Sequence, residues 1–271
     1  MKTVTVEREN NSFQHLEVLK RNREKRARYG KLFVEGVRPI TSAVNHGHTI
    51  EALIAARGAA LSNWAKGIIE RAEPPILYRL SPELMAKLSD KEEMSELLAI
   101  VRTPADDIDR IKIKSVPLVV IFDRPASPGN LGTSIRSCDA FGADGCIITG
   151  HATDLYHPHT IRGSVGAVFS TPVVRLESPG QVQAYYSESK NKHSSLQMIG
   201  SSPAGEIGIS EVDLTRPTFL VVGNETWGMS RFYKEICDLS FKIPQQGYVD
   251  SLNISCATSI ILYEAQKQRS L

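Results

Sequence analysis

Apolar residues follow two successive patterns along the chain. Between Phe33 and Val101, short apolar runs alternate with stretches of helical periodicity, which predicts a small α/β unit. We expect strands at 32–34, 50–55, 75–78 and 97–101, and helices at 37–45 and 61–71. The polar stretch 102–109, which holds one proline and three acids, indicates a linker.

A second α/β pattern begins at Pro117. Residues 118–122 are continuously apolar, as expected of a strand that is buried on both faces of a parallel sheet. Further apolar runs predict strands at 146–148, 173–174, 197–199, 218–222 and 239–243. Helical segments fall between most of these runs, so the pattern predicts a mainly parallel sheet.

Composition narrows the class of protein. The 271 residues are 41% hydrophobic and 23% charged, as in ordinary globular proteins. No apolar run approaches the roughly 18 residues of a membrane span, and the start lacks the apolar block of a signal peptide. The four cysteines form no CxxC pair, so we expect reduced thiols and no bound metal. We therefore predict a cytoplasmic protein.

Positive charge is concentrated near the amino terminus. Residues 1–115 contain 20 Lys+Arg and 16 Asp+Glu, whereas residues 116–271 contain 12 and 14. Such a cluster can neutralise RNA phosphates, although most charge runs are solvated helix faces. The candidate RNA-binding residues are Arg21, Arg23, Lys25, Arg26, Arg28 and Lys31.

The first candidate site segment is 127–136, which directly follows a predicted strand. Ligands of open parallel sheets bind at the carboxyl ends of strands. Asn130 can cap the following helix, and Arg136 lies near its amino end, where a cation opposes the helix dipole. Binding of an RNA phosphate would explain why a cation stands at this position. The alternative explanation is an ion pair of Arg136 with Asp123 or Asp139.

Two further segments have the same character. In 220–230 a strand runs into a glycine-rich loop where Asn224 and Glu225 supply polar groups. In 243–255 a strand end is followed by Ser251 and Asn253 at the start of a helix. Simple helix capping is the alternative for these last two residues.

Taken together, the three segments resemble the SpoU (TrmH-like) family of SPOUT RNA methyltransferases. The match consists of NxGxxxR at 130–136, RxSxGA at 162–167, GNExxGxS at 223–230 and IPxxG…SLNxS at 243–255. It covers about residues 116–266. Residues 30–101 are more weakly similar to the ribosomal-protein-like RNA-binding domain that often precedes this catalytic domain.

The resemblance implies a parallel-sheet SPOUT domain with a trefoil knot, S-adenosylmethionine as cofactor, and a homodimer whose neighbouring subunit helps to form the site. It implies methylation of a ribose 2′-hydroxyl. We favour rRNA because a separate front domain suits recognition of a folded RNA. The expected organisation is an RNA-binding domain at 1–105, a linker at 106–115 and a methyltransferase domain at 116–271.

The resemblance also implies roles for individual residues. The implied cofactor-binding residues are Leu220, Val222, Gly223, Asn224, Gly228, Ile243, Leu252 and Asn253. Arg136 would be the principal catalytic residue, supported by Asn130, Glu225, Ser251 and Asn253. Because a guanidinium stays protonated in proteins, we expect Arg136 to orient the substrate, and we leave the general base open.

Other functions stay open at this point. The alternatives are tRNA as the substrate, a base nitrogen as the methyl acceptor, and RNA binding without catalysis. A methyltransferase of another fold would carry a GxGxG-like turn after its first strand, and none is present. Ser127, Gln245 and Trp227 depart from common family residues, which leaves the subfamily open.

Overall fold

The computed structural model describes residues 1–90, 94–249 and 251–270, and the chain forms two compact units. The first unit combines Met1–Pro104 with Asp154–Ser170. The second combines Ala105–Thr153 with the chain from Thr171 onwards. The RxSxGA segment at 162–167 therefore folds with the first unit, although it lies inside the sequence range expected for the methyltransferase domain.

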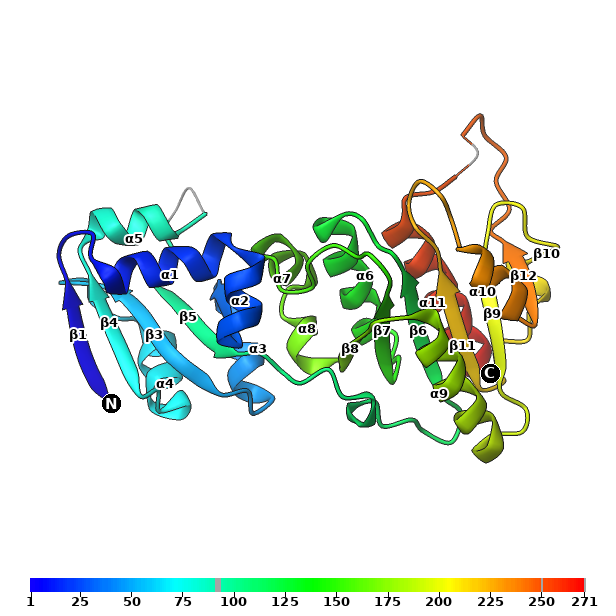
Figure 1. Cartoon of the computed structure of the whole chain (residues 1–271), viewed down its shortest axis with the longest axis horizontal. Coiled ribbons are helices and arrows are strands. Elements are labelled where there is room, and N and C mark those ends of the chain that lie inside the picture. The colour runs from blue at the N-terminus through cyan, green and yellow to red at the C-terminus, as the bar shows by residue number, and fades with distance from the viewer. Residues whose placement is uncertain (91–93, 250, 271) are drawn as a thin grey trace. The chain divides into compact units, whose positions relative to one another are not determined.

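The first unit is a five-stranded sheet with helices on both faces (Figure 1). Its strands run in the order β1-β4-β3-β5-β2, and β5 is antiparallel to both of its neighbours. Its elements are β1 (Lys2–Val6), α1 (Asn11–Arg21), α2 (Arg23–Tyr29), β2 (Lys31–Glu35), α3 (Val37–Asn45), β3 (Ile50–Ala56), α4 (Asn63–Ala72), β4 (Ile76–Leu80), α5 (Pro82–Leu88), β5 (Leu97–Arg102), α7 (Pro158–Ser164) and α8 (Ala167–Ser170).

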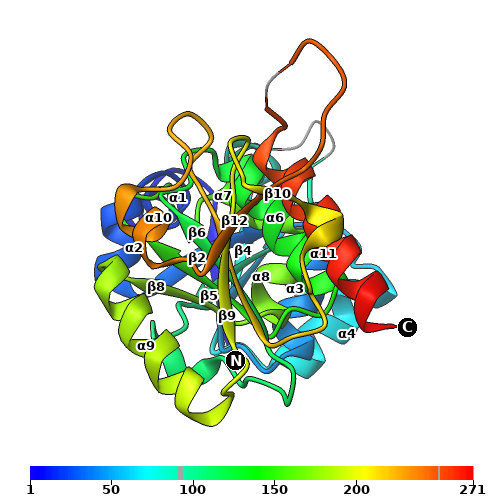
Figure 2. The ribbon, with the colours of Figure 1, turned by 90° about the vertical axis from the view of Figure 1, so that its right-hand side faces the viewer.

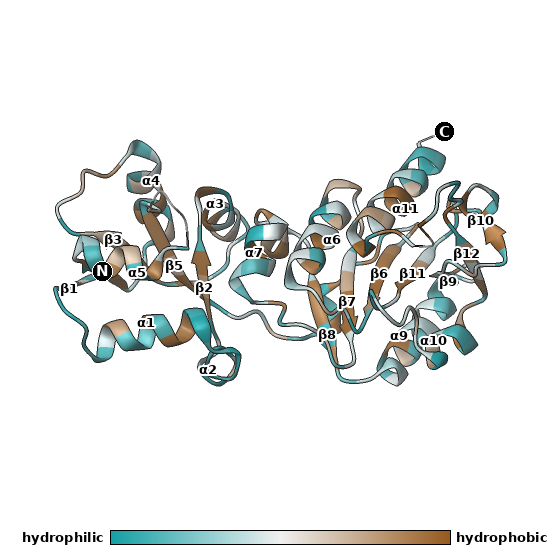
Figure 3. Ribbon diagram, turned by 90° about the horizontal axis from the view of Figure 1, so that it is seen from above, coloured by the Kyte–Doolittle hydropathy of each residue, from teal (hydrophilic) through white to brown (hydrophobic). Residues whose placement is uncertain are grey.

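Burial of one face of each helix stabilises this unit. In α1, Phe13, Leu16 and Leu19 recur at helical spacing and pack with α5 against one face of the sheet. Helices α3 and α4 cover the opposite face (Figure 3). Each predicted strand of this region is present. The strand β1 pairs with β4 in parallel. It is an edge strand that we did not predict.

The 154–170 segment is held to the first unit by polar contacts. Arg162 forms ion pairs with Glu35 and Asp90, and the Ser42 hydroxyl donates to the Gly166 carbonyl at 2.8 Å. Gly166 adopts a φ of 96°, and a side chain there would meet the Ser42 side chain at 2.8 Å. This position therefore requires glycine.

The second unit contains a seven-stranded parallel sheet in the order β10-β12-β9-β11-β6-β7-β8. Its elements are the 3₁₀ helix Ile108–Arg110, β6 (Leu118–Asp123), α6 (Pro128–Ala140), β7 (Gly145–Thr149), β8 (Val173–Leu176), α9 (Pro179–Lys192), β9 (Gln197–Ser201), β10 (Ile207–Gly208), the 3₁₀ helix Ile209–Glu211, β11 (Thr218–Val222), α10 (Arg231–Ile236), β12 (Leu239–Lys242) and α11 (Ile254–Arg269).

The central strands of this sheet are buried on both faces. All residues of β6, β7 and β11 are buried, as their continuous apolar runs predict. Helices α6 and α11 lie side by side on one face, and α9 and α10 cover the other (Figure 2). The expected α/β architecture with a mainly parallel sheet is thereby confirmed.

Two local expectations need correction. Helix α6 begins at Pro128 and is capped by Ser127, whose hydroxyl accepts the Asn130 N–H, so Asn130 is not the cap. Arg136 consequently lies in the middle of the helix, and the argument from the helix dipole does not apply.

Among the described residues, no helix is both long enough and apolar enough to span a membrane.

Candidate functional site

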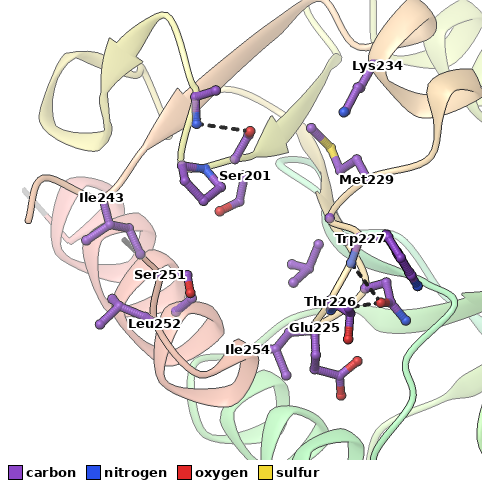
Figure 4. A pocket seen from close by; sticks show the side chains of 18 of the residues that line it. Ser201, Glu225, Thr226, Trp227, Met229, Lys234, Ile243, Ser251, Leu252 and Ile254 are labelled. Atoms are coloured by element: carbon purple, nitrogen blue, oxygen red, sulfur yellow. Dashed lines mark hydrogen bonds between the residues drawn. The ribbon is translucent and has the colours of Figure 1, made fainter. Parts of the chain in front are cut away.

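The three predicted segments meet at the carboxyl ends of the central strands. A cavity of about 470 Å³ is lined by the loop after β11, the strand end at Ile243 and the turn at Leu252 (Figure 4). Its volume lies within the usual range of small-molecule sites. The segments 220–230 and 243–255 line this cavity, and 127–136 reaches its edge through the hydrogen bonds of Asn130 with Glu225 and Asn253.

The loop after β11 closes tightly on itself. Asn224 and Gly228 exchange backbone hydrogen bonds of 3.0 and 2.9 Å, and the Asn224 side-chain oxygen accepts the N–H groups of Thr226 and Trp227. A side chain on Gly223 would overlap the backbone of Gly228 and Met229. Glycine at 223 is therefore a steric requirement of this turn.

A neighbouring turn braces this loop. Arg124, with a φ of 55°, donates to both Asp123 carboxylate oxygens at 3.0 Å and to the Gly228 carbonyl at 3.1 Å. Asp123 also accepts the Ser230 N–H at 2.6 Å. Arg124 is not among the residues predicted for the site, and Asp123 was predicted as an alternative partner of Arg136. The structure pairs Asp123 with Arg124 instead.

Glu225 connects the glycine-rich loop to α6. Its carboxylate accepts the N–H groups of Ala126 and Ser127 and the side-chain amide of Asn130. Partial burial would raise the pKa of Glu225, but the hydrogen bonds outweigh it and the pKa is lowered below its ordinary 4.5. The carboxylate therefore stays ionised and is held as an acceptor.

The same network reaches α11. Asn253 donates from its side-chain amide to the Asn130 oxygen at 3.0 Å, and its own oxygen accepts the Ser255 N–H at the start of α11. Asn253 therefore caps the helix and also binds Asn130. The chain Glu225–Asn130–Asn253 joins the three segments at the edge of the cavity.

Most of the predicted cofactor-binding residues line this cavity. Those found in its wall are Val222, Gly223, Asn224, Gly228, Ile243 and Leu252. Leu220 lies inside β11 and is buried, and Asn253 lies beside the cavity in the hydrogen-bond network. Of the predicted catalytic residues, Glu225 and Ser251 line the wall and Asn130 borders it.

Arg136 lies outside the wall of this cavity. Its side chain is exposed on α6, and within the described residues it forms no hydrogen bond or ion pair. The predicted alternative, a pair with Asp139, is not formed, and Thr171 donates to Asp139 at 3.0 Å. Arg136 is therefore free to bind a group that approaches from outside this chain.

The basic cluster divides into exposed and buried members. Arg26 is only 3% exposed and donates to the Leu19 and Lys20 carbonyls and to Asp154. The expectation that Arg26 contacts RNA needs correction, because its guanidinium is already bound inside the first unit. The members that remain accessible are Arg21, Arg23, Lys25, Arg28 and Lys31.

The cavity offers few ligands for a metal ion. Across residues 1–90, 94–249 and 251–270, no group of three or more His, Cys, Asp or Glu side chains could hold one. The cavity wall combines the apolar side chains of Val222, Met229 and Leu252 with serine hydroxyls and a lysine. This mixture suits an organic molecule with an apolar body and polar ends.

Family models match both units. Residues 117–263 match the SpoU rRNA methylase family, and residues 10–99 match the SpoU L30e-like domain. The first match covers the sheet, the glycine-rich loop and most of α11. The second covers most of the first unit.

Individual relatives extend the similarity over nearly the whole chain. A 23S rRNA (uridine(2479)-2′-O)-methyltransferase of Streptomyces viridochromogenes is 41% identical over 96% of this chain and 91% of its own. The crystal structure of the SpoU methyltransferase AviRb of that organism, in complex with the cofactor AdoMet, superposes with a TM-score of 0.91 at 40% identity, covering 97% of this chain and 99% of the other.

A more distant structure has the same two-part fold. An RNA 2′-O ribose methyltransferase superposes with a TM-score of 0.81 at 28% identity, over 99% of this chain and all of the other. Both the family match and the similarity over the full length agree with the motifs that line the cavity. The chain belongs to the SpoU family of RNA methyltransferases.

Proposed function

We propose that this protein methylates a ribose 2′-hydroxyl of rRNA with S-adenosylmethionine, and that it acts as a cytoplasmic homodimer. The observation that carries the proposal is the cavity lined by Gly223, Ile243 and Leu252, with the Glu225–Asn130–Asn253 network at its edge. The likeness to an AdoMet-bound methyltransferase supports the choice of cofactor.

The cavity wall fits the proposed cofactor. Val222, Ile243 and Leu252 provide apolar surface for an adenosine, and Ser201 and Ser251 provide hydroxyls. The cofactor supplies an electrophilic methyl group on a sulfonium. When bound, it would give this methyl group to the ribose oxygen, with S-adenosylhomocysteine as the leaving group and the hydroxyl proton passing to a base or to water. Positioning of the two reactants accounts for much of the expected acceleration.

Asn130 is the proposed positioning residue between the two reactants. Glu225 accepts one hydrogen bond from its amide nitrogen and Asn253 donates to its oxygen, so both ends of the amide are fixed. A side chain that is held at both ends of its amide keeps one orientation at the edge of the cavity. We assign Ser251, whose backbone begins the turn at Leu252, to the same edge.

Arg136 is the proposed catalytic cation. Because it lies outside its own chain's cavity, we assign it to the cavity of the partner subunit, as the family resemblance implies. There its guanidinium would hold the phosphate next to the target ribose and orient the hydroxyl. Its hydrogen-bond donors are available, since it forms no ion pair with any residue in the described part of the chain.

The first unit supplies the proposed rRNA contacts. Arg21, Lys25 and Arg28 are accessible on α1 and α2 and would neutralise phosphates outside the catalytic cavity. The rRNA substrate of the relative that is 41% identical supports rRNA over tRNA. Action on rRNA also supports the cytoplasmic location.

Arg136→Ala tests the division of labour. We expect transfer of labelled methyl groups to rRNA to fall by at least 100-fold, since a positioned cation stabilises a specific transition-state arrangement. Binding of S-adenosylmethionine, measured by calorimetry, should be unchanged. Equal loss of binding and transfer would contradict the assignment of Arg136.

The substrate and the assembly are tested separately. Labelled methyl groups offered with total RNA from cells that lack this gene should enter 23S or 16S rRNA, and nucleotide mapping should locate them on a ribose oxygen. Label confined to tRNA or to a base nitrogen would overturn the proposed substrate. A monomer in sedimentation at micromolar concentration would overturn the homodimer.

A further inference from the structure

Lys234 is a cation in the cavity wall that no step above uses. It lies on α10, and its side chain extends toward Met229 and the cavity (Figure 4). Among the described residues that line the cavity, Lys234 is the only basic one and Glu225 the only carboxylate. The Glu225 carboxylate is already occupied by hydrogen bonds.

The Lys234 ammonium has no protein partner within the described residues. No hydrogen bond or ion pair joins it to an acidic side chain, although Arg231 and Glu235 on the same helix pair with each other at 2.7 Å. Buried Tyr233 anchors the helix, because its hydroxyl lies 3.0 Å from that of Thr149. The backbone that carries Lys234 is therefore fixed.

Lys234 also lines a second, adjoining cavity. This space of about 260 Å³ shares Ser202, Ala204, Met229 and Lys234 with the first cavity. Glu206 and Asp238 also line this space, and the Asp238 carboxylate is already bound by the Tyr186 hydroxyl, the Met198 N–H and Lys190. Lys234 and the carboxylate of Glu206 in the lining of these adjoining cavities match a zwitterion, whose carboxylate and ammonium need opposite charges.

We propose that Lys234 binds the carboxylate of the cofactor's amino-acid part, which extends from the main cavity toward the second one. The inference rests on the proposed function and adds the orientation of the cofactor to it. The adenosine part lies against the apolar wall near Ile243 and Leu252, and the amino-acid part lies against α10. Glu206 faces the amino group of the same tail.

Two ligands isolate the contribution of the tail. S-adenosylhomocysteine and 5′-methylthioadenosine share the nucleoside and a neutral sulfur, and only the first carries the amino-acid part. Calorimetry on the full-length protein gives the dissociation constant of each. In the unsubstituted protein S-adenosylhomocysteine should bind the more tightly.

Lys234→Met removes the charge and keeps much of the side-chain volume. We expect its affinity for S-adenosylhomocysteine to fall about five- to tenfold, as for the loss of a partly exposed charged hydrogen bond. Its affinity for 5′-methylthioadenosine should change by less than about twofold on the same argument. Lys234→Arg should restore most of the lost affinity, since it returns the charge.

Lys242→Met is the matched control. Lys242 ends β12, is exposed and lines neither cavity, so both ligands should bind this variant as they bind the unsubstituted protein. Thermal unfolding of each variant checks that the fold is retained.

Three results would overturn the inference. Equal weakening of both ligands in Lys234→Met would mean that the residue shapes the cavity and does not bind the tail. Unchanged binding of both ligands by Lys234→Met would mean that Lys234 contacts neither of them. Weaker rRNA binding with unchanged ligand binding would assign the ammonium to a phosphate. If the unsubstituted protein binds neither ligand, the proposed function itself fails.

Discussion

At the scale of single residues, the site depends on how each polar side chain is occupied. Glu225 and Lys234 line the same cavity, but the carboxylate is bound by Ala126, Ser127 and Asn130, while the ammonium has no partner among the residues that the structure describes. A charged group that already has its hydrogen bonds holds the structure together. A charged group without them is available to a ligand. Residue type alone does not distinguish these two cases.

Glu225 makes stability depend on pH. Its pKa is lowered in the folded protein relative to its ordinary 4.5, so the ionised form stabilises the fold above that value. This contribution is lost as the pH falls from 4.5 through the lower pKa of the folded state. We expect Glu225→Gln to unfold more easily at pH 7 and to lose part of the dependence of stability on pH in this acidic range.

Urea unfolding at a series of pH values measures the effect. Glu235→Gln is the control, because Glu235 is exposed and its partner Arg231 is a neighbour on the same short helix. A Glu225→Gln protein whose stability keeps the full dependence on pH below 4.5 would contradict the role assigned to the carboxylate.

At the scale of elements, the loop after β11 has a shape that only glycine permits at 223. A methyl group on Gly223 would overlap the backbone of Gly228 and Met229, which cannot move as a flexible side chain can. We expect Gly223→Ala to destabilise the protein by about 1–3 kcal/mol and to weaken S-adenosylmethionine binding more than tenfold. Thermal unfolding and calorimetry measure the two effects.

Gly129→Ala is the matched glycine control. Gly129 lies in the first turn of α6, where an added methyl would meet only the Ser127 hydroxyl at 3.9 Å. Both stability and cofactor binding should be retained in this variant. Normal cofactor binding by Gly223→Ala would show that the loop can relax around the methyl group.

Long apolar runs gave reliable predictions of elements, and short or charged ones did not. The strand β6 is apolar from Leu118 to Phe122 and was predicted except for its last residue, Asp123, whereas the two-residue strand β10 has no periodic signal. The start of α6 was misplaced because Asn130 is as good a cap as Ser127, and Pro128 decides between them.

The site was predictable where glycine and asparagine mark turns, as at Gly223 and Asn253. It was not predictable where side-chain direction depends on a fold still unknown. Arg124 braces the glycine-rich loop only because its own φ is positive. Lys234 faces the cavity because Tyr233, its neighbour, points into the core.

At the scale of the whole molecule, the chain passes between its two units more than once. After β7 the segment 154–170 joins the first unit, and the chain then returns to form β8. This segment carries the RxSxGA motif, so the family match at 117–263 and the compact units do not share the same boundary. Periodicity along the sequence contains no signal for such a crossing.

A buried ion pair fastens this segment to the first unit. Arg26 and Asp154 are separated by 128 positions and lie 2.5 Å apart, with side chains 4% and 10% exposed. Removing one partner leaves the other charge buried without compensation, which typically costs 3–5 kcal/mol. We expect Arg26→Ala to lower the free energy of unfolding by about 3 kcal/mol, measured by urea unfolding.

Arg28→Ala separates this structural role from the charge of the cluster. Arg28 is an exposed residue of the same helix α2, so its removal should leave stability within about 0.5 kcal/mol. The same variant should weaken rRNA binding and reduce the magnitude of its salt dependence by about one unit. If Arg26→Ala behaved like Arg28→Ala in both measurements, Asp154 would not depend on Arg26, and the segment would be held by its other contacts, among them those of Arg162 and Ser42.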